Sequence, residues 1–96
     1  MSVTEIYVSQ AIEEKIETEH DVTVDEVWEV FHNSDDKAIF FSSPRKGDKR
    51  YLALGRTFAG RYLSVAFARH SKNTIRIITA RDMNRSERRQ YNRKRR

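Results

Sequence analysis

Cysteine is absent from this sequence of 96 residues, proline occurs once, and no apolar run is long enough to span a bilayer. The lack of cysteine excludes disulfides, thiolate-ligated zinc and iron–sulfur clusters. A transmembrane helix needs about 20 consecutive apolar residues, and the N-terminus lacks the basic and apolar stretches of a secretory signal. We therefore expect residues 1–96 to form a single cytoplasmic domain that does not associate with membranes.

Acidic and basic residues are divided unevenly along the chain. Residues 1–36 contain eleven aspartates or glutamates and one lysine, whereas residues 37–96 contain eighteen lysines or arginines and three acids. The two parts carry formal charges of −10 and +15, which together give the net charge of +5. A basic half of this kind is typical of a surface that contacts nucleic acid. The alternative is an ordinary solvated surface whose charges are unevenly distributed.

The first part of the chain predicts a short strand and a helix. Residues 3–8 alternate loosely between apolar and polar side chains, as a strand does. Residues 9–19 place Ala11, Ile12 and Ile16 at helical spacing, with glutamates on the opposite face.

A capping-box pattern predicts the start of a second helix. Thr23 and Glu26, three residues apart, can each accept a hydrogen bond from the backbone N–H of the other. We expect this helix to end near His32–Asn33, with Asn33 in the left-handed conformation. Its apolar face, which we expect in the core, consists of Val24, Val27, Trp28 and Phe31.

The second part of the chain predicts four strands and a final helix. Short turns connect the last three strands, so the sheet should be mostly antiparallel. The expected strands are 38–41, which should be buried, 50–57, 61–69 and 74–81; the expected helix is 84–93. The order β-α-α-β-β-β-β-α predicts an α+β fold with two N-terminal helices and one C-terminal helix beside the sheet.

The turns allow some arginines to be placed in a row. If the turn at 58–60 pairs Thr57 with Arg61, then Arg56 lies beside Tyr62 on the next strand. If the turn at 70–73 pairs Arg69 with Thr74, then Tyr62 lies beside Arg81. Cross-strand partners share a face, so we expect Arg56, Tyr62 and Arg81 to form one row at one end of the sheet.

This row fits metal-independent cleavage of RNA. Arg56 and Arg81 can hold a phosphate by bidentate contacts, Glu87 or His70 can act as the base, and Tyr62, Tyr91 or His70 can donate or position a proton. The predicted catalytic residues are Arg56, Tyr62, His70, Arg81 and Glu87. The predicted RNA-binding residues are Arg61, Arg76, Arg85, Arg88, Arg89 and Tyr91.

Each of these residues also has an ordinary structural interpretation. Glu87 can cap the last helix from Asn84, His70 can be an inert turn histidine, and the arginines can pair with Asp82 or with the glutamates of the early helices. The three histidines have no metal-ligand spacing, and the sequence has no phosphate-binding glycine loop. We therefore expect no metal and no cofactor.

The second half of the chain also resembles a known family. Tyr51, Gly55–Thr57, Gly60–Arg61, Ile75–Arg81 and Ser86–Arg89 follow one another as they do in BrnT proteins. These are small toxins of bacterial type II toxin–antitoxin modules with a RelE-like fold. The resemblance implies an endoribonuclease that inhibits translation. It also implies an antitoxin, of the BrnA type with a ribbon-helix-helix domain, and assembly into a homodimer or a toxin–antitoxin heterotetramer.

The first helix departs from the BrnT pattern. BrnT-like proteins typically have a Trp-Asp step, a helix with Lys and Asn, and a Lys-His-Gly turn. The corresponding positions here are Ser9, Ile12, Ile16 and Glu19, with Asp21 in place of the glycine. Two alternatives to a toxin ribonuclease therefore stay open: a catalytically silent relative that only binds nucleic acid, and an adaptor domain that docks a protein.

Overall fold

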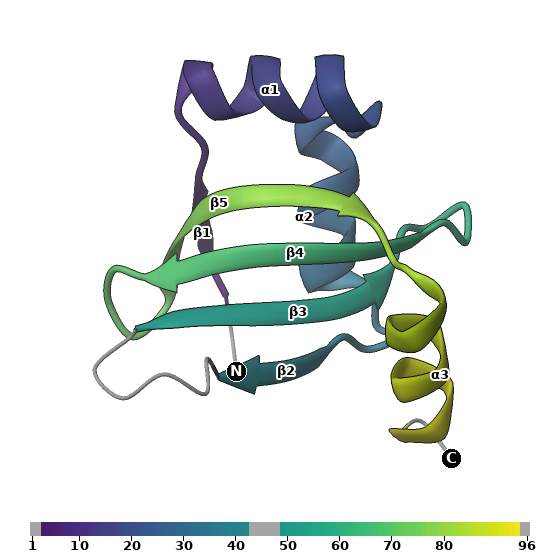
Figure 1. The fold of residues 1–96 in the computed structure, drawn as a ribbon. Helices are drawn as coiled ribbons and strands as arrows, with labels where there is room; N and C mark the ends of the chain where they lie inside the picture. The colour runs from purple at the N-terminus through teal and green to yellow at the C-terminus, as the bar shows by residue number, and fades with distance from the viewer. Residues whose placement is uncertain (1–2, 43–48, 95–96) are drawn as a thin grey trace.

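The computed structural model describes residues 3–42 and 49–94 (Figure 1). Their order is β-α-α-β-β-β-β-α, which confirms the predicted α+β fold. The strands are β1 Glu5–Tyr7, β2 Ile39–Ser42, β3 Arg50–Arg56, β4 Tyr62–Arg69 and β5 Thr74–Asp82. The helices are α1 Gln10–His20, α2 Val24–His32 and α3 Arg85–Lys94. None of these three helices is long and apolar enough to cross a membrane.

The five strands form one sheet in the order β1-β5-β4-β3-β2. The pairs β2–β3, β3–β4 and β4–β5 are antiparallel, as predicted, and β1 pairs with β5 in parallel. The prediction of a buried strand at 38–41 is wrong, because β2 is an edge strand. Ile39, Phe40 and Phe41 are only half-buried there, since one flank of the strand has no neighbouring strand among the described residues.

The two faces of the sheet are covered differently (Figure 1). Helices α1 and α2 cover one face, where the main core is built from residues such as Ile16, Val27 and Phe67. Helix α3 lies against one end of the other face, where Leu54, Met83 and Tyr91 form a second, smaller core. We call these the closed face and the open face, because no helix of the described residues covers the other end of the open face.

Helix α1 begins and ends at residues suited to those positions. The Oγ of Ser9 accepts a hydrogen bond from the N–H of Ile12 at 3.2 Å, which caps the N-terminus. Asp21 follows the last turn with φ 54°, in the left-handed conformation that ends many helices. Ile16, on the inner face, is completely buried.

Helix α2 begins at the predicted capping box, where the N–H of Glu26 bonds to Thr23 Oγ1 and the N–H of Thr23 bonds to Glu26 Oε1. The left-handed conformation predicted for Asn33 is wrong. Asn33 has φ −80° and ψ 101°, because its side chain stabilises the next turn by accepting the N–H groups of Asp35 and Asp36.

Trp28 is the second error in α2. We predicted it in the core, yet it is 47% exposed, and its ring stacks on His32 at 4.1 Å between centroids. Val27 and Val30 are the residues of α2 that are buried against the sheet. Because successive helical residues turn by about 100°, Trp28 lies at the margin of this buried face.

The hairpin register agrees with the prediction on one side only. Arg56 lies opposite Tyr62 and the N–H of Thr57 bonds to the carbonyl of Arg61, as predicted. Arg81, however, lies opposite Ser64 and not Tyr62. The β4–β5 turn is one residue looser than predicted, and a bulge adds a further residue between Ile77 and Thr79. Because the two shifts add up to two residues, Arg81 still projects on the same face as Tyr62.

Candidate functional site

Two guanidinium groups contact the ring of Tyr62 at the end of the open face where β3, β4 and α3 meet. The Cζ of Arg56 lies 4.6 Å from the ring centroid and the Cζ of Arg88 lies 4.1 Å from it. The ring of Tyr91 packs edge-to-face against the Tyr62 ring, with 5.9 Å between their centroids. The aromatic ring stabilises both cations, and it holds them close to one another on the surface of the protein.

Arg81 and Glu87 form an ion pair beside this ring. The Nη1 and Nη2 of Arg81 donate to the two carboxylate oxygens of Glu87 at 2.8 and 3.0 Å. Glu87 also accepts from Ser64 Oγ and from the N–H of Asn84, and the N–H of Glu87 bonds back to Asn84 Oδ1. The predicted capping box at the start of α3 is therefore present.

The ionised state of Glu87 follows from these bonds. Burial is the largest single influence and disfavours the charged form, but the hydrogen bonds from Arg81, Asn84 and Ser64 outweigh it and hold the pKa of Glu87 below its usual range. The same pair raises the pKa of Arg81 above its usual value. The pair is thus a fixed carboxylate and a fixed cation at neutral pH.

Arg56 is held over the β3–β4 turn by backbone and side-chain contacts. Its Nε donates to the carbonyl of Gly60 at 3.1 Å, and its Nη1 lies 3.7 Å from the carboxylate of Asp36. Gly60 has φ +96°, and a Cβ at this position would lie 2.7 Å from Arg56 Nη2. A glycine is therefore needed here both for the turn and for the close approach of the guanidinium group.

We call Arg56, Tyr62, Arg81, Glu87 and Arg88 the arginine–tyrosine cluster. It contains three cations and one carboxylate, and Arg88 is exposed and has no carboxylate partner among the described residues. Guanidinium groups bind phosphate oxygens in bidentate geometry. The cluster can therefore hold a phosphate and, through the Tyr62 hydroxyl, donate or accept a proton beside it.

Arg61 lies outside the cluster because its bonds tie the fold together. Its Nε and Nη2 bind the carboxylate of Asp82 at 2.8 and 3.1 Å, and its Nη1 binds Glu26 at 3.2 Å. The same guanidinium group donates to the carbonyls of His20 and Asp21. We call this set the Arg61 clamp, since it joins the end of α1, the start of α2 and the end of β5.

The charges of the clamp stabilise one another. Hydrogen bonding to Asp82, the largest influence, raises the pKa of Arg61, and the Arg61 guanidinium lowers the pKa of the Asp82 carboxyl. Among our predicted RNA-binding residues, Arg61 therefore has its donors engaged by the protein itself.

The remaining predicted residues lie elsewhere. His70 is in the β4–β5 turn, at the far end of β4 from Tyr62, and Arg76 is near that same end of β5. Tyr91 is completely buried under Tyr62. Arg85 and Arg89 are exposed on α3. The structure therefore brings together Arg56, Tyr62, Arg81, Glu87 and Arg88, and it separates His70 from them.

Two members of the site were missed in the sequence. Ser64 binds Glu87, and strand alternation from Tyr62 would have placed it on the same face. Asp36 pairs with Arg56 across a distance of 20 residues in the chain, and no local pattern indicates that contact.

The sequence matches a family model described as "Ribonuclease toxin, BrnT, of type II toxin-antitoxin system" over residues 11–87. The chain belongs to the BrnT family. BrnT proteins are ribonuclease toxins, so RNA is the substrate of this protein and an antitoxin is its protein partner.

The fold agrees with a solved BrnT structure. The crystal structure of the Brucella abortus ribonuclease toxin BrnT has a TM-score of 0.66 and 19% sequence identity to this chain. The match covers 86% of this chain and all of the Brucella chain. No curated protein matches the sequence.

Four of the five departures from the BrnT pattern around the first helix now have structural roles, and the fifth, Glu19, is exposed. Ser9 caps α1, Ile16 is buried in the main core, and Ile12 packs against that core. Asp21 adopts the left-handed conformation at the position of the BrnT glycine, and its carbonyl accepts a bond from Arg61. Around α1, the substituted residues thus contribute to packing and capping and lie outside the arginine–tyrosine cluster.

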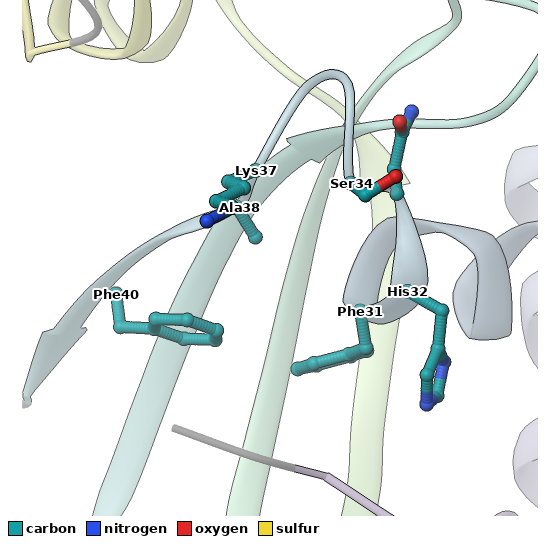
Figure 2. A pocket seen from close by; sticks show the side chains of 7 residues that line it. Phe31, His32, Ser34, Lys37, Ala38 and Phe40 are labelled. Carbon is teal, nitrogen blue, oxygen red and sulfur yellow. The ribbon is translucent and has the colours of Figure 1, made fainter.

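A groove also opens between the end of α2 and β2. Figure 2 shows the residues that line it: Phe31, His32, Asn33, Ser34, Lys37, Ala38 and Phe40. Both ring nitrogens of His32 lie within hydrogen-bonding distance of backbone carbonyls, those of Trp28 and Val3. His32 therefore ties the N-terminal segment to α2. Over residues 3–42 and 49–94, no three His, Asp or Glu side chains gather as a metal site would require.

Proposed function

We propose that this BrnT protein cleaves RNA at the arginine–tyrosine cluster without a metal ion and inhibits translation by doing so. The observation that carries the proposal is the contact of Arg56 and Arg88 with one half-buried tyrosine ring. Arg88 has no carboxylate partner among the described residues and Arg56 has one only at 3.7 Å, so both can bind a further anion. The anion of an RNA substrate is its phosphodiester.

Cleavage without a metal uses the ribose 2′-hydroxyl as nucleophile. Its oxygen forms a bond to phosphorus, the bond from phosphorus to the 5′-oxygen breaks, and the products are a 2′,3′-cyclic phosphate and a 5′-hydroxyl. The 2′-hydroxyl loses a proton and the departing 5′-oxygen gains one. Negative charge accumulates on the phosphoryl oxygens in between, where Arg56, Arg81 and Arg88 would stabilise it.

Glu87 serves in this proposal as a positioning residue. A carboxylate has about four lone-pair sites, and Glu87 accepts bonds from two nitrogens of Arg81, from Asn84 and from Ser64. Its side chain is also only 11% exposed. The carboxylate therefore orients Arg81 and has no lone pair left for the substrate.

Tyr62 is then the member of the cluster that relays the proton: its hydroxyl oxygen accepts the proton of the 2′-hydroxyl as its own proton passes to the departing 5′-oxygen. Its hydroxyl can both donate and accept, and its ring lies between the groups that would hold the phosphate. A positioned group of this kind contributes roughly 10²- to 10⁴-fold to a proton transfer.

The finer features of the partner are also proposals. We propose an antitoxin of the BrnA type, with a ribbon-helix-helix domain, bound in a toxin–antitoxin heterotetramer or to a toxin homodimer. We propose the cytoplasm, where RNA is translated, as the place of action, and a single domain over residues 1–96.

The test is cleavage of purified total RNA in EDTA. The wild-type protein should produce fragments ending in a 2′,3′-cyclic phosphate. Because single oxyanion-stabilising groups contribute roughly 10²- to 10³-fold, the Arg56→Ala/Arg88→Ala protein should be slower by at least about 10²-fold. Arg69→Ala is the matched control, since Arg69 lies at the other end of β4 and bonds to Lys72.

Two results would count against the proposal. Equal rates for the wild-type and Arg56→Ala/Arg88→Ala proteins would place cleavage outside the cluster. RNA binding by the wild-type protein without any cleavage, on free RNA and on translating ribosomes, would favour the catalytically silent alternative.

A further inference from the structure

A second feature of the open face lies at the end that α3 does not reach. Arg50, Ala68, Arg76 and Tyr7 are register partners on four adjacent strands, β3, β4, β5 and β1. Cross-strand partners share a face. Ala68 is three strand alternations from Tyr62, so this row and the arginine–tyrosine cluster project from the same side of the sheet.

The row combines an exposed aromatic ring with exposed cations. Tyr7 is 59% exposed, and Arg76 beside it is exposed and has no carboxylate partner among the described residues. Ala68 lies between Arg50 and Arg76, and its small side chain projects little from the sheet. An aromatic ring of this exposure on an edge strand adds little to the core, whereas Ile6, the preceding residue, packs against it.

A pocket lies directly beside Tyr7. It is lined by Glu5, Tyr7, His70, Thr74 and Arg76. The carboxylate of Glu5 would repel a phosphate but can accept a hydrogen bond from the amino group of a base. The chemistry of the pocket therefore suits a nucleobase, with the phosphate backbone turned towards Arg76.

We infer that Tyr7 and Arg76 form a binding subsite for single-stranded RNA, separate from the cleavage site. Tyr7 stacks on an unpaired base and Arg76 contacts the adjoining phosphate. Proteins bind single strands in this way, with aromatic platforms for the bases and cations for the backbone. The inference rests on the proposed function for the nature of the substrate.

The two sites are at a useful distance for one strand. Arg76 and Arg81 are both on β5, five residues apart, which corresponds to roughly 16 Å along a strand. An RNA whose phosphate lies in the arginine–tyrosine cluster can therefore reach Tyr7 a few nucleotides away along the open face. A base in a duplex cannot stack on Tyr7, so the subsite selects unpaired RNA.

Binding of an uncleavable RNA tests the inference. The probe is a fluorescently labelled single-stranded oligoribonucleotide with every 2′-hydroxyl methylated, titrated at low salt. Because stacking contributes strongly for each base, Tyr7→Ala should weaken binding by about tenfold, while Tyr7→Phe, which keeps the ring, should stay within about twofold. Arg76→Ala should reduce the slope of log affinity against log salt by about 0.7.

Phe58→Ala is the matched control. Phe58 is 60% exposed, as Tyr7 is, but lies in the β3–β4 turn, so its loss should leave binding unchanged. A duplex version of the probe should bind the wild-type and Tyr7→Ala proteins equally. Thermal unfolding of each variant checks that it is folded, and Tyr7→Ser provides a second loss of the ring.

The results separate this inference from the proposed function. If the wild-type protein cleaves RNA but Tyr7→Ala and Tyr7→Ser bind the probe as tightly as it does, the subsite is wrong and the cleavage site stands. If cleavage fails but the Tyr7 variants lose affinity and Tyr7→Phe does not, the subsite stands alone. No binding by the wild-type protein, or equal losses in Tyr7→Ala and Phe58→Ala, would overturn the subsite.

Discussion

Arg56 and Arg61 are five residues apart on the same hairpin, yet their charges are balanced to very different extents by neighbouring groups. Arg61 is surrounded by two carboxylates and two carbonyls that match its charge and its donors. Arg56 shares a tyrosine ring with Arg88, and its one carboxylate is 3.7 Å away. A matched cation stabilises the fold, whereas the less fully paired cations are the ones that we propose bind the substrate.

The uneven charge of the chain is the source of this difference. The acidic residues belong mainly to the segment that forms α1 and α2, behind the closed face. Glu26, from this segment, bonds to Arg61 at 3.2 Å. On the open face, Arg56 reaches only Asp36, at 3.7 Å, and Arg88 has no carboxylate partner among the described residues.

The largest effect is expected on the cleavage rate, when the hydroxyl group of Tyr62 is removed. Tyr62→Phe keeps the ring that both guanidinium groups contact but removes the hydroxyl. Cleavage should slow by about 10²-fold, while affinity for uncleavable RNA stays within about twofold. Single-turnover cleavage measures the effect, and Tyr51→Phe is the control, because Tyr51 stacks on Phe67 towards the closed face. A rate within threefold of the wild-type rate would remove Tyr62 from proton transfer.

The second prediction compares the contributions of Arg61 and Arg56 to the stability of the fold. Arg61→Ala should lower the free energy of unfolding by about 2 kcal/mol, because it leaves Asp82 and Glu26 without their partner. The Arg61 side chain is 26% exposed, so we expect less than the loss typical of a fully buried pair. Arg56→Ala should cost under about 1 kcal/mol. Urea unfolding measures both, and equal losses would contradict the division between a structural and a functional arginine.

The third prediction concerns pH. The pKa of Glu87 is lower in the folded protein than the ordinary value of 4.5, so the unfolded chain binds more protons near that pH. The ionised carboxylate therefore stabilises the fold above about pH 4.5, and this contribution is lost as the pH falls through the folded pKa. Asp82, whose pKa is also lowered, acts in the same direction.

The Glu87→Gln variant isolates the contribution of Glu87 to this pH dependence of stability. At about pH 7 the variant should be less stable than the wild type by about 1 kcal/mol, and the difference should shrink at about pH 3. Urea unfolding at both values provides the measurement. A difference that stays constant between them would show that the charge of Glu87 does not contribute.

The smallest effect is expected at Asp21. Asp21→Gly restores the residue typical of BrnT proteins and removes the strain of the left-handed conformation. It also increases the conformational entropy of the unfolded chain. Since these two effects oppose each other, the free energy of unfolding should change by less than about 0.5 kcal/mol. The carbonyl that Arg61 uses is retained. A larger loss in thermal or urea unfolding would mean that the Asp21 side chain itself stabilises the clamp.

Local patterns predicted most of the fold. Both capping boxes and the β3–β4 register were correct, because each depends on residues close together in the sequence. The β4–β5 register was wrong, since the turn is one residue looser than predicted and a bulge leaves no signal in a run of alternating residues. Trp28 was misplaced because helical spacing alone does not say how wide the buried face is.

The candidate site was predictable in outline only. Arg56, Tyr62, Arg81 and Glu87 share one end of the sheet, where strand alternation and the last capping box put them. The contact of Arg88 with Tyr62 depends on how α3 packs, and the Arg61 clamp joins residues 20, 26 and 82. Neither arrangement follows from spacing along the chain.

The Arg61 clamp can form only after Asp82 has been synthesised. The helical layer is synthesised first, but Arg61 and Asp82, which fasten it, emerge much later, and Glu87 and Arg88 emerge later still. Contacts between such distant residues form late in folding. A chain still attached to the ribosome before Asp82 has emerged therefore lacks the contacts that fasten the helical layer to the sheet.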